Sequence, residues 1–299
     1  MLINNTETCS ANLQGKIYVL FVVLNAASGL LAVMGNAVVL FVVYRTRALR
    51  TVSNYFICSL AVADFLVGLV INPLYIALVS LGVWVSNHPL YQAENYLWVH
   101  SLATTTFSLA AISVDQYIAV TKVFLYERAM TEKRCCLIIG SVWSFSAIFA
   151  STTFCIAPSE TPKLWIACVI VTVGIPLSVM IYCYYYIFRE AKSQLQKMTA
   201  NATRQMSEVS KNKKAAMTVA IIFGLFVCLF TPNLVFSVFN LSAKSSCQNA
   251  TLYQNWLWAI WLALSSSACN PWVYAIRCRD YREAFKKICH QAVNASQFL

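Results

Sequence analysis

Long, uninterrupted runs of apolar residues dominate the chain, and short polar segments separate them. Seven runs can be recognised, at about residues 17–44, 54–80, 92–121, 135–156, 163–188, 215–241 and 252–276. Each is long enough to cross a bilayer as an α-helix, which takes roughly 20 residues. The strands of a membrane barrel would instead alternate polar and apolar positions. The pattern therefore predicts an all-α membrane protein, a bundle of seven transmembrane helices.

The first apolar run resembles a signal peptide, because Lys16 precedes it. It is too long for one, however, no small-residue cleavage site ends it, and Arg45 and Arg47 follow. We interpret it as a retained membrane anchor. The expected organisation is an extracellular N-terminus at 1–16, a seven-helix membrane domain at 17–276, and a cytoplasmic segment at 277–299.

Composition agrees with this interpretation. Of the 299 residues, 59% are hydrophobic and only 11% are charged, and the mean hydropathy is +0.63. Soluble domains average about 25% charged residues, so this chain has too few to cover a water-facing surface.

Basic residues are divided unequally between two sets of loops. One set consists of the N-terminus and residues 81–91, 157–162 and 242–251. With its flanks it contains only Lys16, Lys163 and Lys244 of the 22 Lys and Arg residues. Cytoplasmic loops carry the excess of Lys and Arg, so we expect a multi-pass plasma-membrane protein with its N-terminus outside. The net charge of +11 then reflects topology and attraction to anionic lipids, not nucleic-acid binding.

Glycosylation signals fit the same orientation. The sequons at Asn4 and Asn249 fall outside, where glycosylation is expected, and those at Asn201 and Asn294 fall inside. Short sequons also arise by chance, so this support is weak.

The segment RCRDYREAFKKICHQ follows the last run and has an apolar face at helical spacing, formed by Tyr281, Phe285 and Ile288. Basic residues surround this face, which is typical of a short amphipathic helix on the inner membrane surface. Cys289, at its end, is a candidate for palmitoylation; an unmodified thiol is the alternative.

Polar residues inside the spans are the candidates for function. Asp64, in SLAVADFLVGL, is the one unambiguous charge deep in a span, where ionisable residues are costly and mark functional sites. The alternative is a protonated carboxyl held by core hydrogen bonds. Further polar residues could join it: Asn36, Ser101, Thr105, Ser267 and Asn270. Carboxylate, hydroxyl and amide oxygens suit a hard cation, and a transporter or channel could be built the same way.

Seven short motifs also occur in order along the chain. They are GN at 35–36, LAVAD ending at Asp64, DQY at 115–117, Trp143, Pro176 with Tyr184, FTP at 230–232 and NPWVY at 270–274. Any one is weak, but together, each at the right depth, they are specific. The chain resembles the rhodopsin-like (class A) G-protein-coupled receptors from about residue 28 to residue 287.

The resemblance implies a receptor that binds an extracellular small-molecule, lipid or peptide ligand and activates a heterotrimeric G protein. It identifies the polar set around Asp64 as the family's sodium pocket, with a sodium ion as the only expected cofactor. It also implies switch and coupling residues near the inner face: Asp115, Gln116, Tyr117, Tyr184, Asn212, Pro232, Pro271 and Tyr274. No H-E-x-x-H, G-x-S-x-G or phosphate-loop motif occurs, so an enzyme is not expected.

The outer side departs from the family pattern. Tyr91 stands where the family usually has the Cys that bonds to the second outer loop, and that loop is short and has no Cys. Cys9 and Cys247 are both expected outside, where disulfides persist, and are candidates to bond to each other; free thiols are the alternative.

The ligand cannot be named from the sequence. Trp98 stands where amine-binding relatives have an Asp, which excludes the usual amine salt bridge. Glu94, one helical turn above, is either a replacement or a solvated residue at the mouth of the bundle. The remaining candidates are aromatic or polar, and packing is the alternative role for each: Trp98, Phe230, Trp256, Asn95, Cys168, Thr172, Asn233 and Ser237.

Gln116 stands where the family has an Arg that pairs with the preceding Asp and with an acid at the base of span six. Here the span-six position is Asn212. An amide–amide hydrogen bond could replace the ion pair, and such a weaker latch predicts higher basal activity; alternatively, loss of the guanidinium leaves a receptor that couples poorly. Two other functions stay open, a non-signalling seven-helix partner of another receptor and, less well supported, an ion transporter.

Overall fold

The computed structural model describes residues 13–83, 88–155, 161–197, 203–242 and 246–296, and these residues form helices with no β-strand. The α-helices are α1 (Gly15–Arg45), α2 (Val52–Leu66), α3 (Asn72–Leu81), α4 (Pro89–Thr121), α5 (Val123–Ala129), α6 (Glu132–Ser151), α7 (Thr161–Val169), α8 (Ile175–Lys197), α9 (Thr203–Ser242), α10 (Ser246–Arg277) and α11 (Arg279–Ser296). Short 3-10 turns occupy Arg47–Leu49 and Thr152–Phe154. The predicted helical fold is confirmed.

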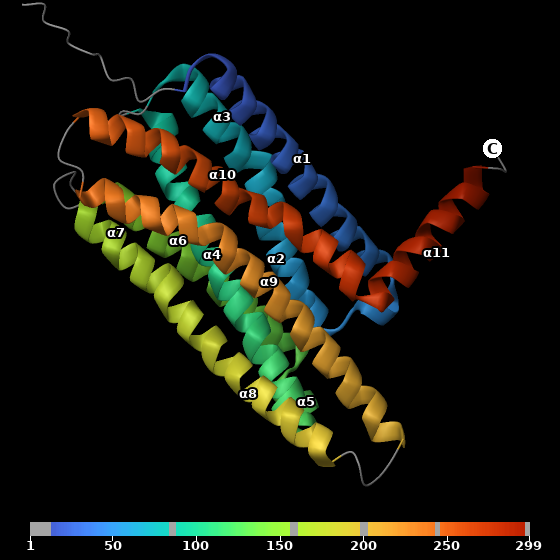
Figure 1. Cartoon of the computed structure of the whole chain (residues 1–299). Helices are drawn as coiled ribbons and strands as arrows, with labels where there is room; N and C mark the ends of the chain where they lie inside the picture. The colour runs from blue at the N-terminus through green and yellow to red at the C-terminus, as the bar shows by residue number, and fades with distance from the viewer. Residues whose placement is uncertain (1–12, 84–87, 156–160, 198–202, 243–245, 297–299) are drawn as a thin grey trace, which may run out of the picture.

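Six spans in the described part of the chain are long and apolar enough to cross a membrane. Two of them join consecutive helices, α2 with α3 and α7 with α8, through a π-helical turn. The seventh helix of the bundle is α10, in which Ser266, Ser267 and Asn270 are buried. α4 is the most enclosed of these six spans, with 67% of its apolar 18-residue stretch buried. Figure 1 shows the long helices side by side as one bundle.

Each π-helical turn lies just before a proline. Residues Val67–Ile71 precede Pro73, and Ile170–Gly174 precede Pro176. Proline lacks an amide N–H and clashes with the preceding turn, so the helix widens locally. Pro232 and Pro271, in contrast, lie inside α9 and α10, which continue through them.

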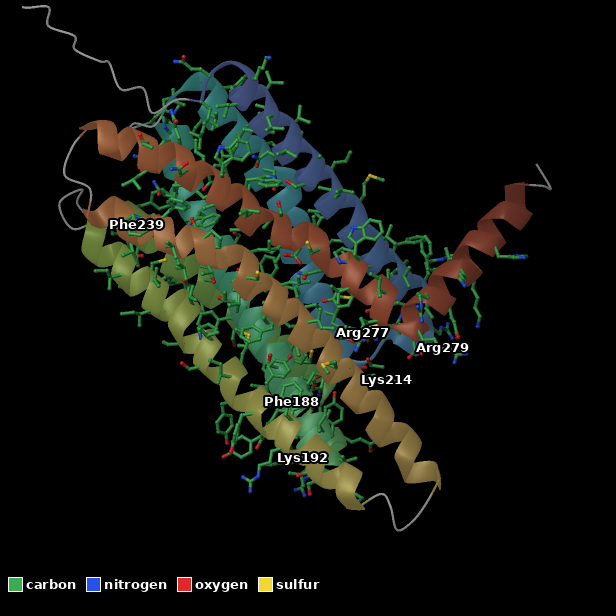
Figure 2. The ribbon with its side chains drawn as sticks, viewed as in Figure 1. Phe188, Lys192, Lys214, Phe239, Arg277 and Arg279 are labelled. Carbon is green, nitrogen blue, oxygen red and sulfur yellow. The ribbon has the colours of Figure 1, made fainter. Side chains whose placement is uncertain are left out.

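The two ends of the bundle differ in charge. Figure 2 shows Lys192, Lys214, Arg277 and Arg279 at one end, and Phe239 toward the opposite end of α9. The basic end is the one from which α11 turns away from the bundle, at the end of α10 (Figure 1). Of the apolar face predicted for α11, Tyr281 is buried and Ile288 is partly buried, whereas Phe285 is 45% exposed. Ala284 is buried in addition to the predicted residues.

Several predictions concern parts of the chain outside the described residues. Cys9 and Asn4 lie before the first described residue, and the side chains of Cys247, Asn249, Cys289 and Asn212 are likewise outside the description. The outer disulfide, the glycosylation sites and the palmitoylation site therefore stay predictions.

Candidate functional site

The centre of the bundle holds a buried carboxyl. Asp64 on α2 is fully buried, and its Oδ2 accepts a hydrogen bond of 2.7 Å from Nδ2 of Asn270 on α10. Its Oδ1 makes no hydrogen bond to a described residue, although the Ser267 hydroxyl lies near the carboxyl. Asn36 on α1 donates to the Ser267 carbonyl at 3.1 Å and leaves its own Oδ1 without a hydrogen bond. Three helices thus meet at one polar point that retains unused oxygen acceptors.

A glycine allows this meeting. A Cβ at Gly35 would lie 2.8 Å from Cγ of Pro271, which no real structure tolerates without movement. Since glycine lacks that atom, α1 approaches α10 closely enough for Asn36 to reach Ser267. The motifs GN and NPWVY therefore act together through packing.

A small cavity lies beside this polar point. Its volume is about 30 Å³, and its polar lining consists of Ser101, Thr105, Ser266 and Ser267. That volume suits one or two water-sized occupants. Trp98 and Phe230 line the same cavity, and their rings stack with centroids 6.3 Å apart. Hydroxyl groups beside a carboxylate with a free oxygen are suitable ligands for a hard cation, so the residues fit sodium.

Glu94 does not lie in solvent. Its side chain is only 4% exposed, and the Tyr75 hydroxyl donates to its Oε1. Tyr75 in turn contacts Trp98 edge-on, with ring centroids 6.3 Å apart. The interpretation of Glu94 as a solvated residue at the mouth is therefore wrong: α3 and α4 bury it together. Glu94, Tyr75, Trp98 and Phe230 form a continuous chain of contacts toward the cavity.

The other ligand candidates have local partners. Thr172 donates to the Cys168 carbonyl at 2.7 Å, and Ser237 donates to the Asn233 carbonyl at 2.7 Å. Oδ1 of buried Asn233 has no hydrogen bond to a described residue. The last two candidates contact residues of their own helices: Asn95 donates to the Tyr91 carbonyl at 3.2 Å, and Trp256 packs on Tyr253 at a centroid distance of 5.3 Å.

Near the C-terminal end of α4, Asp115 gathers three donors. It is fully buried and accepts hydrogen bonds from Ser53 at 2.5 Å, Tyr126 at 2.8 Å and Gln116 at 3.1 Å. Burial is the main reason why the pKa of Tyr126 lies above its usual range, and the neighbouring Asp115 carboxyl raises this pKa further. The phenol therefore keeps its proton and donates. Gln116 is thus already engaged with Asp115, and its predicted bond to Asn212 stays untested because that side chain is outside the description.

The predicted switch tyrosines lie in separate aromatic contacts. Tyr184 stacks on Phe223 at 5.9 Å, and Tyr274 stacks on Tyr281 of α11 at 5.9 Å. Tyr117 packs against Tyr182 and Tyr186 of α8, with centroids 6.0 and 6.2 Å apart. Their role as switch residues stays a prediction.

Sequence reasoning missed three inner residues. Ser53 and Tyr126 hold Asp115, and Phe124 on α5 is 93% exposed, the largest exposure among the exposed large hydrophobic side chains. The signal for Phe124 is a phenylalanine seven positions after Tyr117, beyond the end of the third apolar run, within TKVFLYER. Ser53 and Tyr126 carried no local signal, because they lie 62 and 11 positions away from Asp115 in the sequence.

Long apolar helices packed around a polar centre, with the stacked rings of Trp98 and Phe230 beside it, define a seven-helix membrane protein. The family model described as 7 transmembrane receptor (rhodopsin family) matches residues 35–274. The chain belongs to this family and is therefore a G-protein-coupled receptor, a signalling protein and not an enzyme.

Curated relatives agree. The chain is 29% identical to the adenosine receptor A2a of Homo sapiens over 93% of this chain and 74% of that protein. It is 30% identical to the octopamine receptor beta-2R of Chilo suppressalis, over 86% and 76% of the two chains. It is 27% identical to the melanocortin receptor 4 of Danio rerio, over 87% and 81%. These relatives have different ligands by name, so similarity alone does not select one.

Proposed function

We propose that this receptor resides in the plasma membrane with its N-terminus outside, and that sodium at Asp64 opposes its activation. The orientation follows from the basic residues gathered at one end of the bundle. The ligand enters from the opposite end and contacts the outer aromatic cluster, which consists of the stacked rings of Trp98 and Phe230. It also contacts Trp256, which packs on Tyr253.

The observation that carries the proposal is the unused oxygen of Asp64 beside the hydroxyl-lined cavity. Trp98 and Phe230 line that cavity and also belong to the outer aromatic cluster. A ligand that moves these rings therefore changes the space available to the cation. Coupling between two sites is reciprocal. A cation that binds the resting state more tightly therefore weakens the binding of a ligand that prefers the active state.

The inner surface formed by α5 and the ends of α4, α8 and α9 contacts the G protein. Phe124 supports this role, since a nearly fully exposed phenylalanine on the inner side is suited to insertion into a partner. The octopamine and trace amine receptors among the relatives, together with the adenosine and melanocortin receptors, support a ligand of small-molecule or peptide class.

The test is nucleotide exchange on a panel of purified heterotrimeric G proteins, with the full chain reconstituted in lipid vesicles. We expect exchange above that of empty vesicles on at least one G protein. Exchange equal to empty vesicles on every member of the panel, with folded receptor, would contradict signalling and favour a silent partner of another receptor.

A further inference from the structure

Glu94 is a buried acid without a basic partner among the described residues. It lies five positions after Pro89, the first residue of α4, which places it roughly 7–8 Å below the outer end of that helix. Burying a carboxylate is costly unless a counter-charge or several donors stabilise it. One phenol, that of Tyr75, donates to it. The site therefore lacks the counter-charge that an ionised carboxyl needs, and a bound cation would supply it.

Aromatic rings from three helices surround this carboxyl. Tyr75 belongs to α3, and Tyr91 and Trp98 belong to α4. Tyr253 of α10 lies close enough to Glu94 for direct electrostatic interaction, as does Tyr91. The faces of phenol and indole rings attract cations, and an ammonium group has three donors for a carboxylate. Hydrogen bonds between charged groups are about twice as strong as neutral ones.

We propose that Glu94 and these rings bind the ammonium group of a monoamine ligand, whose aromatic tail reaches Trp98. This rests on the proposed function, because it names the ligand class of that receptor. Glu94 and Trp98 are four positions apart on α4, or about 6 Å along the axis. A two-carbon linker between ammonium and ring matches that spacing.

Through Trp98, the aromatic ring of the ligand would contact residues deeper in the bundle. Trp98 stacks on Phe230, and both line the cavity beside Ser101 and Ser267. An amine held by Glu94 therefore acts on the same ring that borders the sodium pocket. Glu94 lies one helical turn above Trp98, the position at which amine-binding relatives have an Asp. The ammonium group would therefore bind about one turn farther out than in those relatives.

The competing explanation is a structural clamp in which Tyr75 and Glu94 merely join α3 to α4. The two explanations separate through substitution. Glu94→Gln keeps an acceptor for Tyr75 but removes the negative charge. Tyr75→Phe removes the donor and keeps the charge. A clamp keeps its hydrogen bond in Glu94→Gln and loses it in Tyr75→Phe, whereas a cation site loses function only in Glu94→Gln.

The experiment measures thermal unfolding of the purified full chain in detergent, with 2-phenylethylamine as the probe and the neutral 2-phenylethanol as its matched control. We expect the amine to raise the unfolding midpoint with saturation, because it binds the folded state, and the alcohol to leave it unchanged. In Glu94→Gln the half-saturating concentration should rise by about tenfold or more. Tyr75→Phe and Glu94→Asp should keep the response.

Three results overturn the site: no response of the parent to the amine, equal responses to amine and alcohol, or a parent-like response of Glu94→Gln. Loss of the response in Tyr75→Phe also overturns it, in favour of the clamp. If Glu94→Gln does not fold, the parent and Glu94→Asp still test the site, because the amine should raise their unfolding midpoints and the alcohol should not. No G protein is present, so failed nucleotide exchange would overturn the proposed function without changing this result.

Discussion

Gln116 illustrates how much one side chain changes the inner end of the receptor. Asp115 needs no cation, since Ser53, Tyr126 and Gln116 donate to it. A neutral donor nevertheless holds it less firmly than a guanidinium would, because a bond between charged groups adds roughly 1 kcal/mol over a neutral one. The resting state therefore lacks one strong interaction, which favours the weak-latch interpretation over a silent receptor.

The first prediction follows at this scale. Gln116→Arg combined with Asn212→Glu should lower basal nucleotide exchange about fivefold, since roughly 1 kcal/mol of added resting-state stability changes the equilibrium by that factor. The measurement is GTP exchange without ligand in vesicles. Basal exchange in the double variant that equals or exceeds the parent value would rule out a weak latch.

Phe124 allows a second prediction. It is 93% exposed on α5, so Phe124→Ala should leave folding unchanged and reduce G-protein activation about tenfold or more, the loss expected when an anchoring aromatic is removed from an interface. Phe239→Ala is the matched control, because Phe239 is 53% exposed toward the other end of the bundle (Figure 2). An equal effect of both substitutions would argue against a coupling role for α5.

Between elements, glycine decides how closely α1 packs on the span formed by α2 and α3. A Cβ at Gly68 would lie 2.5 Å from the Gly29 carbonyl oxygen and 2.9 Å from the Ala32 Cβ. The same approach lets Asn72 donate to Ser28 at 3.2 Å and to the Asn25 carbonyl at 3.1 Å. Small residues thus bring backbones together and polar side chains join them, as is typical of membrane helices.

Gly68→Ala should therefore destabilise the receptor by about 1–3 kcal/mol, the usual cost of an overpacked contact. Gly140→Ala and Gly224→Ala are matched controls, because nothing lies within 4 Å of a Cβ at either position. In those two, replacing a helical glycine should be neutral or stabilising by up to about 1 kcal/mol. The check is the thermal unfolding midpoint; a Gly68→Ala midpoint as high as those of the controls would disprove the close-packing account.

At the scale of the whole molecule, the polar centre joins α1, α2, α4 and α10. Under the proposed sodium mechanism, activation that rearranges these helices would change the space beside Asp64, and one ion would thereby influence both ends of the bundle. The outer chain of contacts from Glu94 to Phe230 reaches the same cavity.

Sodium should accordingly lower basal exchange and weaken any ligand that prefers the active state. A coupling of roughly 1–2 kcal/mol predicts a five- to thirtyfold change. Asp64→Asn should abolish the sodium dependence, and Glu94→Gln, which changes the other buried acid, should retain it. Potassium at equal ionic strength is the salt control; an identical response to the two salts in the parent would exclude a sodium site.

The candidate site was only partly predictable. Asp64, Asn36 and Asn270 could be named from the sequence, because polar residues deep in apolar runs must face the interior. The state of Glu94 could not, because it depends on Tyr75 of a different helix. Ser53 and Tyr126 were missed for the same reason: their bonds to Asp115 join distant segments, and neither residue is unusual where it stands.

The sequence by itself determined the long apolar helices and their membrane character, because hydrophobic length and charge act locally and need no partner; the short helix α5 and the π-helical turns that divide two of the spans were not predicted. The structure of the polar centre was decided only by tertiary packing. Gly35 and Gly68 set how closely α1 approaches its neighbours, and that approach determines which oxygens are satisfied and which stay free. Burial of Glu94 and of Asp115 likewise arises only when separate helices enclose them, since the environment of a charge is a property of everything packed around it.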